Sequence, residues 1–114
     1  MPSTVPNALA TRLALVTSTS PVKLTDASGS PLLLAYTRRW QLWIPATTQA
    51  LTLVRYRTRG RIDWPWSDWV TATGVTPAAG GCGTVSVDGD CSYELDVEVT
   101  AAGAGTVSFY LVGV

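Results

Sequence analysis

Six side chains in the middle of the chain have the types and the spacing to stack on one another. They are three arginines, Arg55, Arg57 and Arg59, followed by three tryptophans, Trp64, Trp66 and Trp69. Successive side chains of an extended strand point to opposite faces, so the alternating arginines project from one face. A guanidinium group over an indole gains about 0.5–2 kcal/mol. The segment 51–73 therefore predicts an arginine–tryptophan ladder that stabilises the fold.

The box Trp66-Ser67-Asp68-Trp69, preceded by a strand with alternating arginines, resembles the tryptophan–arginine ladder of cytokine-receptor fibronectin type III domains. The likeness covers about a fifth of the chain, and Val70 stands where the receptor box ends in serine. The secretion signal and the paired cysteines of the receptors are missing. The resemblance implies the same stacking of indoles on guanidinium groups, which we interpret as shared packing physics rather than kinship.

The tryptophans predict a different function if they face solvent. The chain has five, at Trp40, Trp43, Trp64, Trp66 and Trp69, which is many for 114 residues. A row of exposed rings on a β-sandwich can bind sugars by stacking, so a carbohydrate-binding module is the alternative function. A nucleic acid could follow the arginines between 55 and 61, interleaved with Tyr56. Neutral net charge and a single lysine, Lys23, argue against a nucleic-acid partner.

Catalytic chemistry has little support in the composition. The chain has no histidine, which removes the commonest general base and metal ligand and leaves the cysteines without an activator. Asp63 and Asp68 flank tryptophans and suggest a glycosidase pair, but their place among arginines favours surface salt bridges. The loop 88–90 has too few oxygen ligands for Ca²⁺. We therefore expect no enzyme activity, no cofactor and no metal site.

Two cysteines, Cys82 and Cys91, bracket a turn signal at 88–89. The Asp-Gly pair favours the type I′ turn of a two-residue hairpin. In that hairpin Cys91 faces Ser86 and Cys82 faces Leu95, which holds the sulfurs too far apart for a disulfide. An open loop would instead permit a disulfide. The hairpin favours two free thiols.

Short runs rich in Val, Leu, Thr, Tyr and Trp must position these side chains, and turn residues separate the runs. The runs predict strands at 12–17, 22–25, 32–36, 40–44, 51–59, 69–73, 84–87, 93–100 and 106–112. No run has the apolar spacing of a helix. We predict an all-β fold, a single jelly-roll-like β-sandwich of eight to nine short antiparallel strands over 11–114, with an N-terminal arm at 1–10.

The charged residues divide along the chain. Six arginines and no acid lie between 38 and 61, and seven acids and no base lie between 63 and 98. This division favours either pairing between strands of one subunit or contact of a basic face with an acidic face on a neighbour. The predicted strand 93–100 turns Tyr93 and Leu95 one way and Glu94 and Asp96 the other. We expect its acids to face solvent or a basic partner.

A surface with few charges predicts contact with other protein. Charged residues make up 14% of the chain, against roughly 25% in an average domain. The last predicted strand, 106–112, is apolar on both faces, as a central covered strand or an interface strand would be. The candidate contact residues are Arg38, Arg39, Trp43, Arg55, Arg57, Arg59 and Tyr110.

The segments 17–24 and 32–35, with a Ser/Gly turn between them, resemble the opening of small tailed-phage virion proteins, and 93–114 resembles their ending. Such proteins include capsid decoration proteins and the bases of spikes or tail appendages, often β-sandwiches. The resemblance implies a non-enzymatic structural subunit of a virus particle. It would act in the virion by contact with capsid, tail or spike subunits and with its own copies, as a homo-oligomer.

Targeting segments are not evident in the sequence. Arg12 interrupts the apolar stretch 7–17, which makes a poor signal-peptide core. No window approaches the 18 or so apolar residues of a membrane span. We therefore expect synthesis in the host cytoplasm and no membrane partner.

Overall fold

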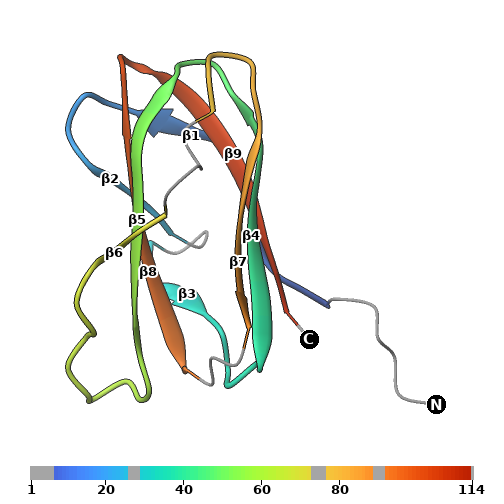
Figure 1. Cartoon of the computed structure of the whole chain (residues 1–114), viewed down its shortest axis with the longest axis vertical. Helices are drawn as coiled ribbons and strands as arrows, with labels where there is room; N and C mark the ends of the chain where they lie inside the picture. Colours follow the sequence, from blue (N-terminus) through green and yellow to red (C-terminus); the bar gives the residue numbers. More distant parts are fainter. Residues whose placement is uncertain (1–6, 26–28, 73–76, 89–91, 114) are drawn as a thin grey trace.

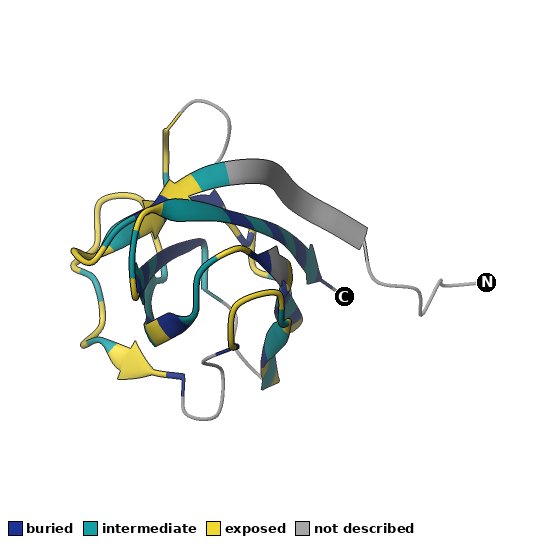
Figure 2. Ribbon diagram, turned by 90° about the horizontal axis from the view of Figure 1, so that it is seen from above, coloured by how far each residue is buried: buried dark blue, intermediate teal, exposed yellow. Residues whose placement is uncertain are grey.

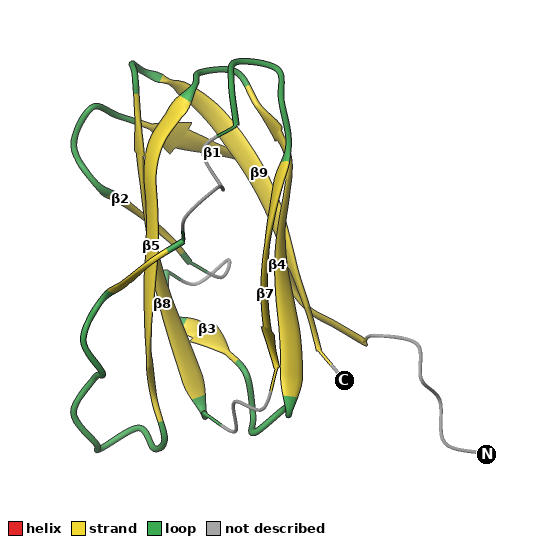
Figure 3. Ribbon diagram, viewed as in Figure 1, coloured by secondary structure: helices red, strands yellow, loops and turns green. Residues whose placement is uncertain are grey.

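The computed structural model describes residues 7–25, 29–72, 77–88 and 92–113. These residues form nine antiparallel strands in two packed sheets, a β-sandwich (Figure 1). The strands are β1 Asn7–Thr17, β2 Val22–Leu24, β3 Leu32–Leu33, β4 Arg39–Thr47, β5 Leu51–Arg59, β6 Val70–Thr71, β7 Gly83–Asp88, β8 Glu94–Ala101 and β9 Gly105–Gly113. Strands and loops account for the described chain in Figure 3. The predicted all-β sandwich is confirmed.

The strands pair from the ends of the chain inward. Sheet A has the order β1-β9-β4-β7, and sheet B has the order β2-β8-β5-β6. In sheet B, β2 and β3 both pair with β8, β2 with Val97 to Val99 and β3 with Glu94 and Leu95. The two short strands therefore lie one after the other along the same edge of β8. The nested pairs are therefore β1 with β9, β2 and β3 with β8, β4 with β7, and β5 with β6.

Alternating side chains of both sheets fill the space between them. In β9, Val107, Phe109 and Leu111 are buried, while the residues between them are half-buried on the opposite face. Figure 2 shows this alternation along the strands, with the buried positions in dark blue. Trp40 is 1% exposed and packs edge-on against Tyr56, with ring centroids 5.4 Å apart. The described residues contain no helix long and apolar enough to span a membrane.

The first strand begins earlier than predicted. Its pairing with β9 starts at Asn7 opposite Gly113, so residues 7–10, which we assigned to an N-terminal arm, lie in sheet A. The backbone hydrogen bonds that β9 offers along its edge favour this extension. The remainder of the predicted arm, 1–6, lies outside the described residues.

Pro45 does not end β4, although the sequence predicted a strand end at Ile44. The strand continues to Thr47, and its register with β9 shifts between Trp43 and Ala46. On the other side, Ile44 is opposite Gly83, where β7 begins. Proline cannot donate to a ladder and is tolerated at a bulge. Pro45 therefore occupies an irregularity within the strand.

The hairpin predicted at 88–89 is wrong. Strand β7 pairs with β4 in sheet A, and β8 pairs with β5 in sheet B, so the chain crosses between the sheets. The physical reason lies in the charges of β8, because Glu94, Asp96 and Glu98 are opposite arginines of β5. Opposite charges across two strands stabilise the pairing. Residues 89–91 themselves lie outside the described part.

The turn between β3 and β4 places two residues other than glycine in the left-handed region. Ala35 has φ 50° and Tyr36 has φ 65°, and the Thr37 N–H donates to the Leu34 carbonyl at 3.1 Å. Positive φ at both central positions defines a type I′ turn, which glycine and asparagine prefer. The left-handed backbone conformation of Ala35 and of Tyr36 costs about 1 kcal/mol for each residue.

We expect Ala35→Gly to raise the free energy of unfolding by about 0.5–1 kcal/mol, because glycine adopts positive φ without strain. Urea titrations of the wild type and of the Ala35→Gly variant measure the difference in the free energy of unfolding. The control is Ala102→Gly, at an exposed position without positive φ, where the substitution should lower stability. A loss of stability in Ala35→Gly would rule out the strained turn.

Candidate functional site

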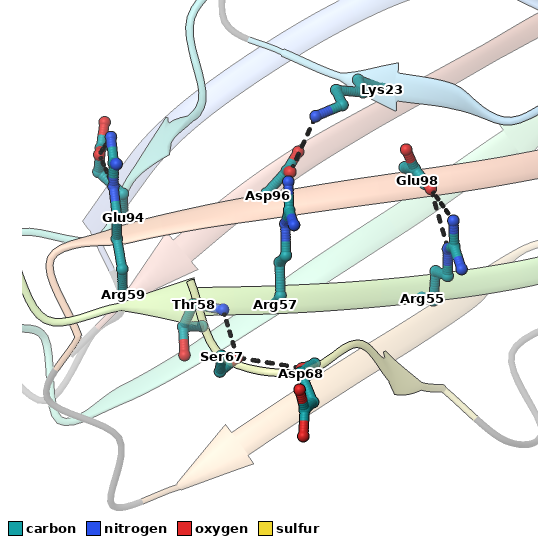
Figure 4. A network of polar contacts seen from close by, with 10 residues as sticks. All are labelled: Lys23, Arg55, Arg57, Thr58, Arg59, Ser67, Asp68, Glu94, Asp96 and Glu98. Atoms are coloured by element: carbon teal, nitrogen blue, oxygen red, sulfur yellow. Dashed lines mark hydrogen bonds and ion pairs between the residues drawn. The ribbon is translucent and has the colours of Figure 1, made fainter. Parts of the chain in front are cut away.

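The three alternating arginines lie on one face of β5, each opposite an acid of β8. Arg55 is opposite Glu98, Arg57 opposite Asp96, and Arg59 opposite Glu94. These cross-strand neighbours form ion pairs, with Nε to carboxylate distances of 2.9, 3.0 and 2.6 Å in the same order. Figure 4 shows the three pairs side by side across the two strands. The charge division of the sequence is thus resolved within one chain at these positions.

Asp96 is the most buried acid of this row and has two cationic partners. Its side chain is 5% exposed, and its Oδ2 accepts from Arg57 Nε and from Lys23 Nζ, both at 3.0 Å. Lys23 comes from β2, on the other side of β8, so the carboxylate lies between two strands (Figure 4). A buried carboxylate needs such partners, because desolvation of an unpaired charge costs several kcal/mol.

Trp66 and Trp69 stack between the arginines from the solvent side. The Trp69 ring lies 4.4 Å from the guanidinium carbon of Arg55 and 4.4 Å from that of Arg57. The Trp66 ring lies 5.2 Å from Arg57 and 4.4 Å from Arg59. The order is therefore Arg55, Trp69, Arg57, Trp66, Arg59, a set that we call the ladder. The stacking predicted from the sequence is confirmed for these five residues.

Backbone hydrogen bonds hold the tryptophan segment against β5. The Ser67 N–H donates to the Thr58 carbonyl at 2.8 Å, and its hydroxyl accepts from the Thr58 N–H at 3.0 Å. Further along, the Ala72 N–H donates to the Val54 carbonyl at 2.8 Å. Ser67 thereby substitutes for a strand partner between the two indoles and fixes their spacing.

Trp64 is not part of the ladder, contrary to the prediction. The residue is 53% exposed, and the arginine beside its ring is Arg61, at 5.9 Å. The chain turns after Gly60, and the Trp64 N–H donates to the Arg61 carbonyl at 3.1 Å. A Cβ on Gly60 would lie 3.0 Å from the Trp64 ring, so the indole packs on the bare glycine. The turn therefore places this ring beyond the last rung.

The ladder leaves few charges available to a partner on sheet B. Each of its arginines has an indole on one side and a carboxylate on another, and their side chains are 18–32% exposed. Arg55, Arg57 and Arg59 were predicted both as ladder residues and as interface residues. Their contacts satisfy the first role within the chain.

Two other predicted contact residues, Trp43 and Tyr110, stack on the outer face of sheet A. Their rings are 5.8 Å apart and nearly parallel, with an angle of 6° between the planes. They are opposite each other on β4 and β9, the two central strands of the sheet. Trp43 Nε1 donates to Gln41 Oε1 at 3.1 Å.

The described side chains around this pair are uncharged. The set that we call the sheet A face consists of Gln41, Trp43, Thr84, Ser86, Thr106, Ser108, Tyr110 and Val112, which alternate with core positions and are half-buried or exposed. Arg39 and Asp88, an exposed pair 3.3 Å apart, lie at one end of β4 and β7. Arg38, the remaining predicted contact residue, is exposed in the loop before β4.

Sequence reasoning missed the partners of the predicted residues more than the residues themselves. Lys23 was noted only as the single lysine, yet it binds Asp96. Gln41, Thr84 and Ser86 were not identified, although alternation around Trp40 and Leu42 places Gln41 beside Trp43. The signal for this face is an alternating strand whose outward residues are polar but uncharged.

The remaining reactive groups are scattered. Cys82 is an exposed free thiol just before β7, whereas Cys91 lies outside the described residues. Asp63 is exposed, 3.4 Å from Arg61, which matches the predicted surface salt bridge. Asp68 is exposed beside the ladder.

Comparison with protein-family models, with curated proteins and with solved structures finds no match for this chain.

Proposed function

We propose that this chain is a non-enzymatic structural subunit of a virus particle, a capsid-decoration or appendage-docking protein that acts by protein–protein contact. The observation that carries the proposal is the sheet A face, which is uncharged and has the Trp43–Tyr110 stack at its middle. Aromatic residues are enriched and charged residues depleted at the core of protein interfaces. Since the ladder neutralises the charges of sheet B, the sheet A face is the better contact surface.

We further propose that the sandwich is a jelly roll. The support is the nesting of strand pairs, from β1 with β9 to β5 with β6, and the alternation of successive pairs between the two sheets, whose orders are β1-β9-β4-β7 and β2-β8-β5-β6. A long two-stranded ribbon rolled into two sheets has this arrangement. Viral capsid domains and lectins both use it. A fold hosts many functions, so it supports the class of protein and not the partner.

A location in the virion is part of this proposal. It is supported by the resemblance of both ends of the chain to small tailed-phage virion proteins and by the low content of charged residues, 14%. The partners would be capsid, tail or spike subunits. No cofactor or metal is required, because binding comes from apolar burial and hydrogen bonds of serine, threonine and glutamine side chains.

A carbohydrate-binding module is the second candidate, and the same aromatic pair favours it. Trp43 and Tyr110 are surrounded by hydroxyl and amide groups that can bind sugars. Three of the other tryptophans are committed elsewhere, since Trp40 is buried and Trp66 and Trp69 stack on arginines. Trp43 also has one ring face against Tyr110 and its N–H on Gln41. These contacts leave little of a platform, so we place this function second.

Co-expression with the proteins encoded by the neighbouring genes tests the first proposal. We expect a capsid or tail protein to co-purify with the tagged chain and to be lost with Trp43→Arg, which puts a charge on the sheet A face. The control is Trp64→Ala, which alters an exposed ring on the β5–β6 loop. The proposed contact function fails if the tagged chain captures neither a capsid protein nor a tail protein. It also fails if the Trp43→Arg variant captures the same protein as well as the wild type does.

A further inference from the structure

We infer that the sheet A face packs against the same face of a second copy of this chain, which forms a twofold dimer. The inference rests on the proposed contact function and names one partner for that face. It is carried by the charge, the area and the centre of the face. Each of these properties suits contact between two identical surfaces.

The charge of the face allows it to meet itself. In a twofold contact the same patch lies on both sides, so any charge near the axis meets its own copy. The eight residues of the face carry no charge at all. Arg39 and Asp88 lie at its end and compensate each other, with 3.3 Å between them. The arginines and acids of sheet B, by contrast, pair with one another, and Trp66 and Trp69 stack on the arginines.

The area of the face is sufficient for a weak but specific dimer. The four strands of sheet A, about 4.8 Å apart, give a width of about 19 Å, and strands of about nine residues give a length of about 30 Å. The eight named residues lie on β4, β7 and β9, and β1 supplies the rest of this width. One copy therefore offers roughly 550 Å², and two copies bury roughly 1,100 Å², near the lower limit of specific interfaces. No described segment lies over the outside of sheet A in Figure 1, whereas the β5–β6 loop lies on the side of sheet B.

The centre of the face has the residues that dominate binding energy. Trp43 is midway along β4, and its partner in the stack, Tyr110, is on the neighbouring central strand. Trp and Tyr at the middle of an interface, ringed by less important polar contacts, form the usual hot spot. Two twisted sheets pack face to face about 10 Å apart with strands about 30° apart. A twofold axis near Trp43 brings the two aromatic pairs into contact.

Sedimentation equilibrium of the purified chain from about 1 to about 200 µM tests the dimer, since interfaces near the lower size limit are usually weak and this range covers micromolar dissociation constants. We expect a monomer–dimer equilibrium in the wild type. Trp43→Arg should raise the dissociation constant at least about 100-fold, because it buries unpaired charges at the axis. Ser86→Arg, on an exposed position of the same face, should do the same if Trp43→Arg fails to fold.

The control is Trp64→Ala, which should dimerise as the wild type does. A monomer at the highest concentration would overturn the dimer, and so would a dimer that persists in both arginine variants. The proposed contact function survives that result if a capsid or tail protein still co-purifies in a Trp43-dependent manner. A monomer whose tryptophan fluorescence changes on titration with polysaccharide would overturn the dimer and favour the carbohydrate function.

Discussion

Arg57→Ala is expected to lower the free energy of unfolding by about 3 kcal/mol, which corresponds to roughly 10 °C in Tm for a domain of this size. The guanidinium group stacks on Trp66 and Trp69 and binds Asp96. Each stacking contact contributes about 0.5–2 kcal/mol. The substitution also leaves Asp96, at 5% exposure, with Lys23 as its remaining cation. Urea titration followed by far-ultraviolet circular dichroism measures the change.

Arg61→Ala is the matched control, because Arg61 has the same chemistry without the burial. It is 59% exposed, lies 5.9 Å from Trp64 and pairs with an exposed Asp63. Exposed pairs contribute little, so we expect a change within about 0.5 kcal/mol. Equal effects of the two substitutions would show that the inner arginine is not held by the indoles.

Asp96→Ala is expected to cost about 3 kcal/mol as well, for the complementary reason. The substitution removes the carboxylate that lies between Arg57 and Lys23 and leaves the guanidinium group without its partner in a largely enclosed site. Removal of one member of a buried ion pair typically costs about 3–5 kcal/mol. The half-exposed Lys23 can turn to water, which places the expected value at the lower end. Thermal and urea unfolding report the loss.

Asp88→Ala provides the comparison for Asp96→Ala. Its pair with Arg39 is similar in charge and distance, at 3.3 Å, but the two side chains are 60% and 72% exposed. Solvent screens such a pair, and we expect a change of at most about 0.5 kcal/mol. The difference between the two aspartate variants therefore measures the effect of burial on one type of contact. No difference between them would contradict the enclosed network on sheet B.

The ladder was predictable because it depends on local sequence. Arginines that alternate along a strand must share a face, and a box of two tryptophans with Ser67 between them returns along the same strand edge. The alternating acids of β8 predicted a partner row of basic side chains. The sequence left open whether that basic row belongs to the same chain or to a neighbour. Pairing of β8 with β5 is a contact between distant segments, which local periodicity does not specify.

The errors have the same origin. The hairpin predicted at 88–89 rested on a strong local turn signal, and the arginines of β5 attract the acids of β8 into the other sheet. Trp64 was counted in the ladder by its position in the sequence, but the turn after Gly60 carries it past Arg59. The pairing of Trp43 with Tyr110 joins β4 to β9 across most of the chain. Neither strand alone indicates that these rings meet.

A division of labour between the two sheets follows from these contacts. Sheet B neutralises its charges internally, and the arginine-rich half of the chain is used to hold the fold together. The sheet A face keeps its aromatic pair half-buried, with no charge among the described side chains that surround it. The central claim is that contact with other protein takes place on sheet A, while the ladder serves stability.

The ¹⁵N–¹H spectrum of the chain at increasing concentration tests this claim most directly, because each of the five tryptophans gives a separate indole N–H signal. Single substitutions assign the signals. We predict that the Trp43 signal shifts with concentration and that the Trp66 and Trp69 signals stay in place. Shifts of Trp66 and Trp69 with a stationary Trp43 signal would contradict the account and place the contact on the ladder.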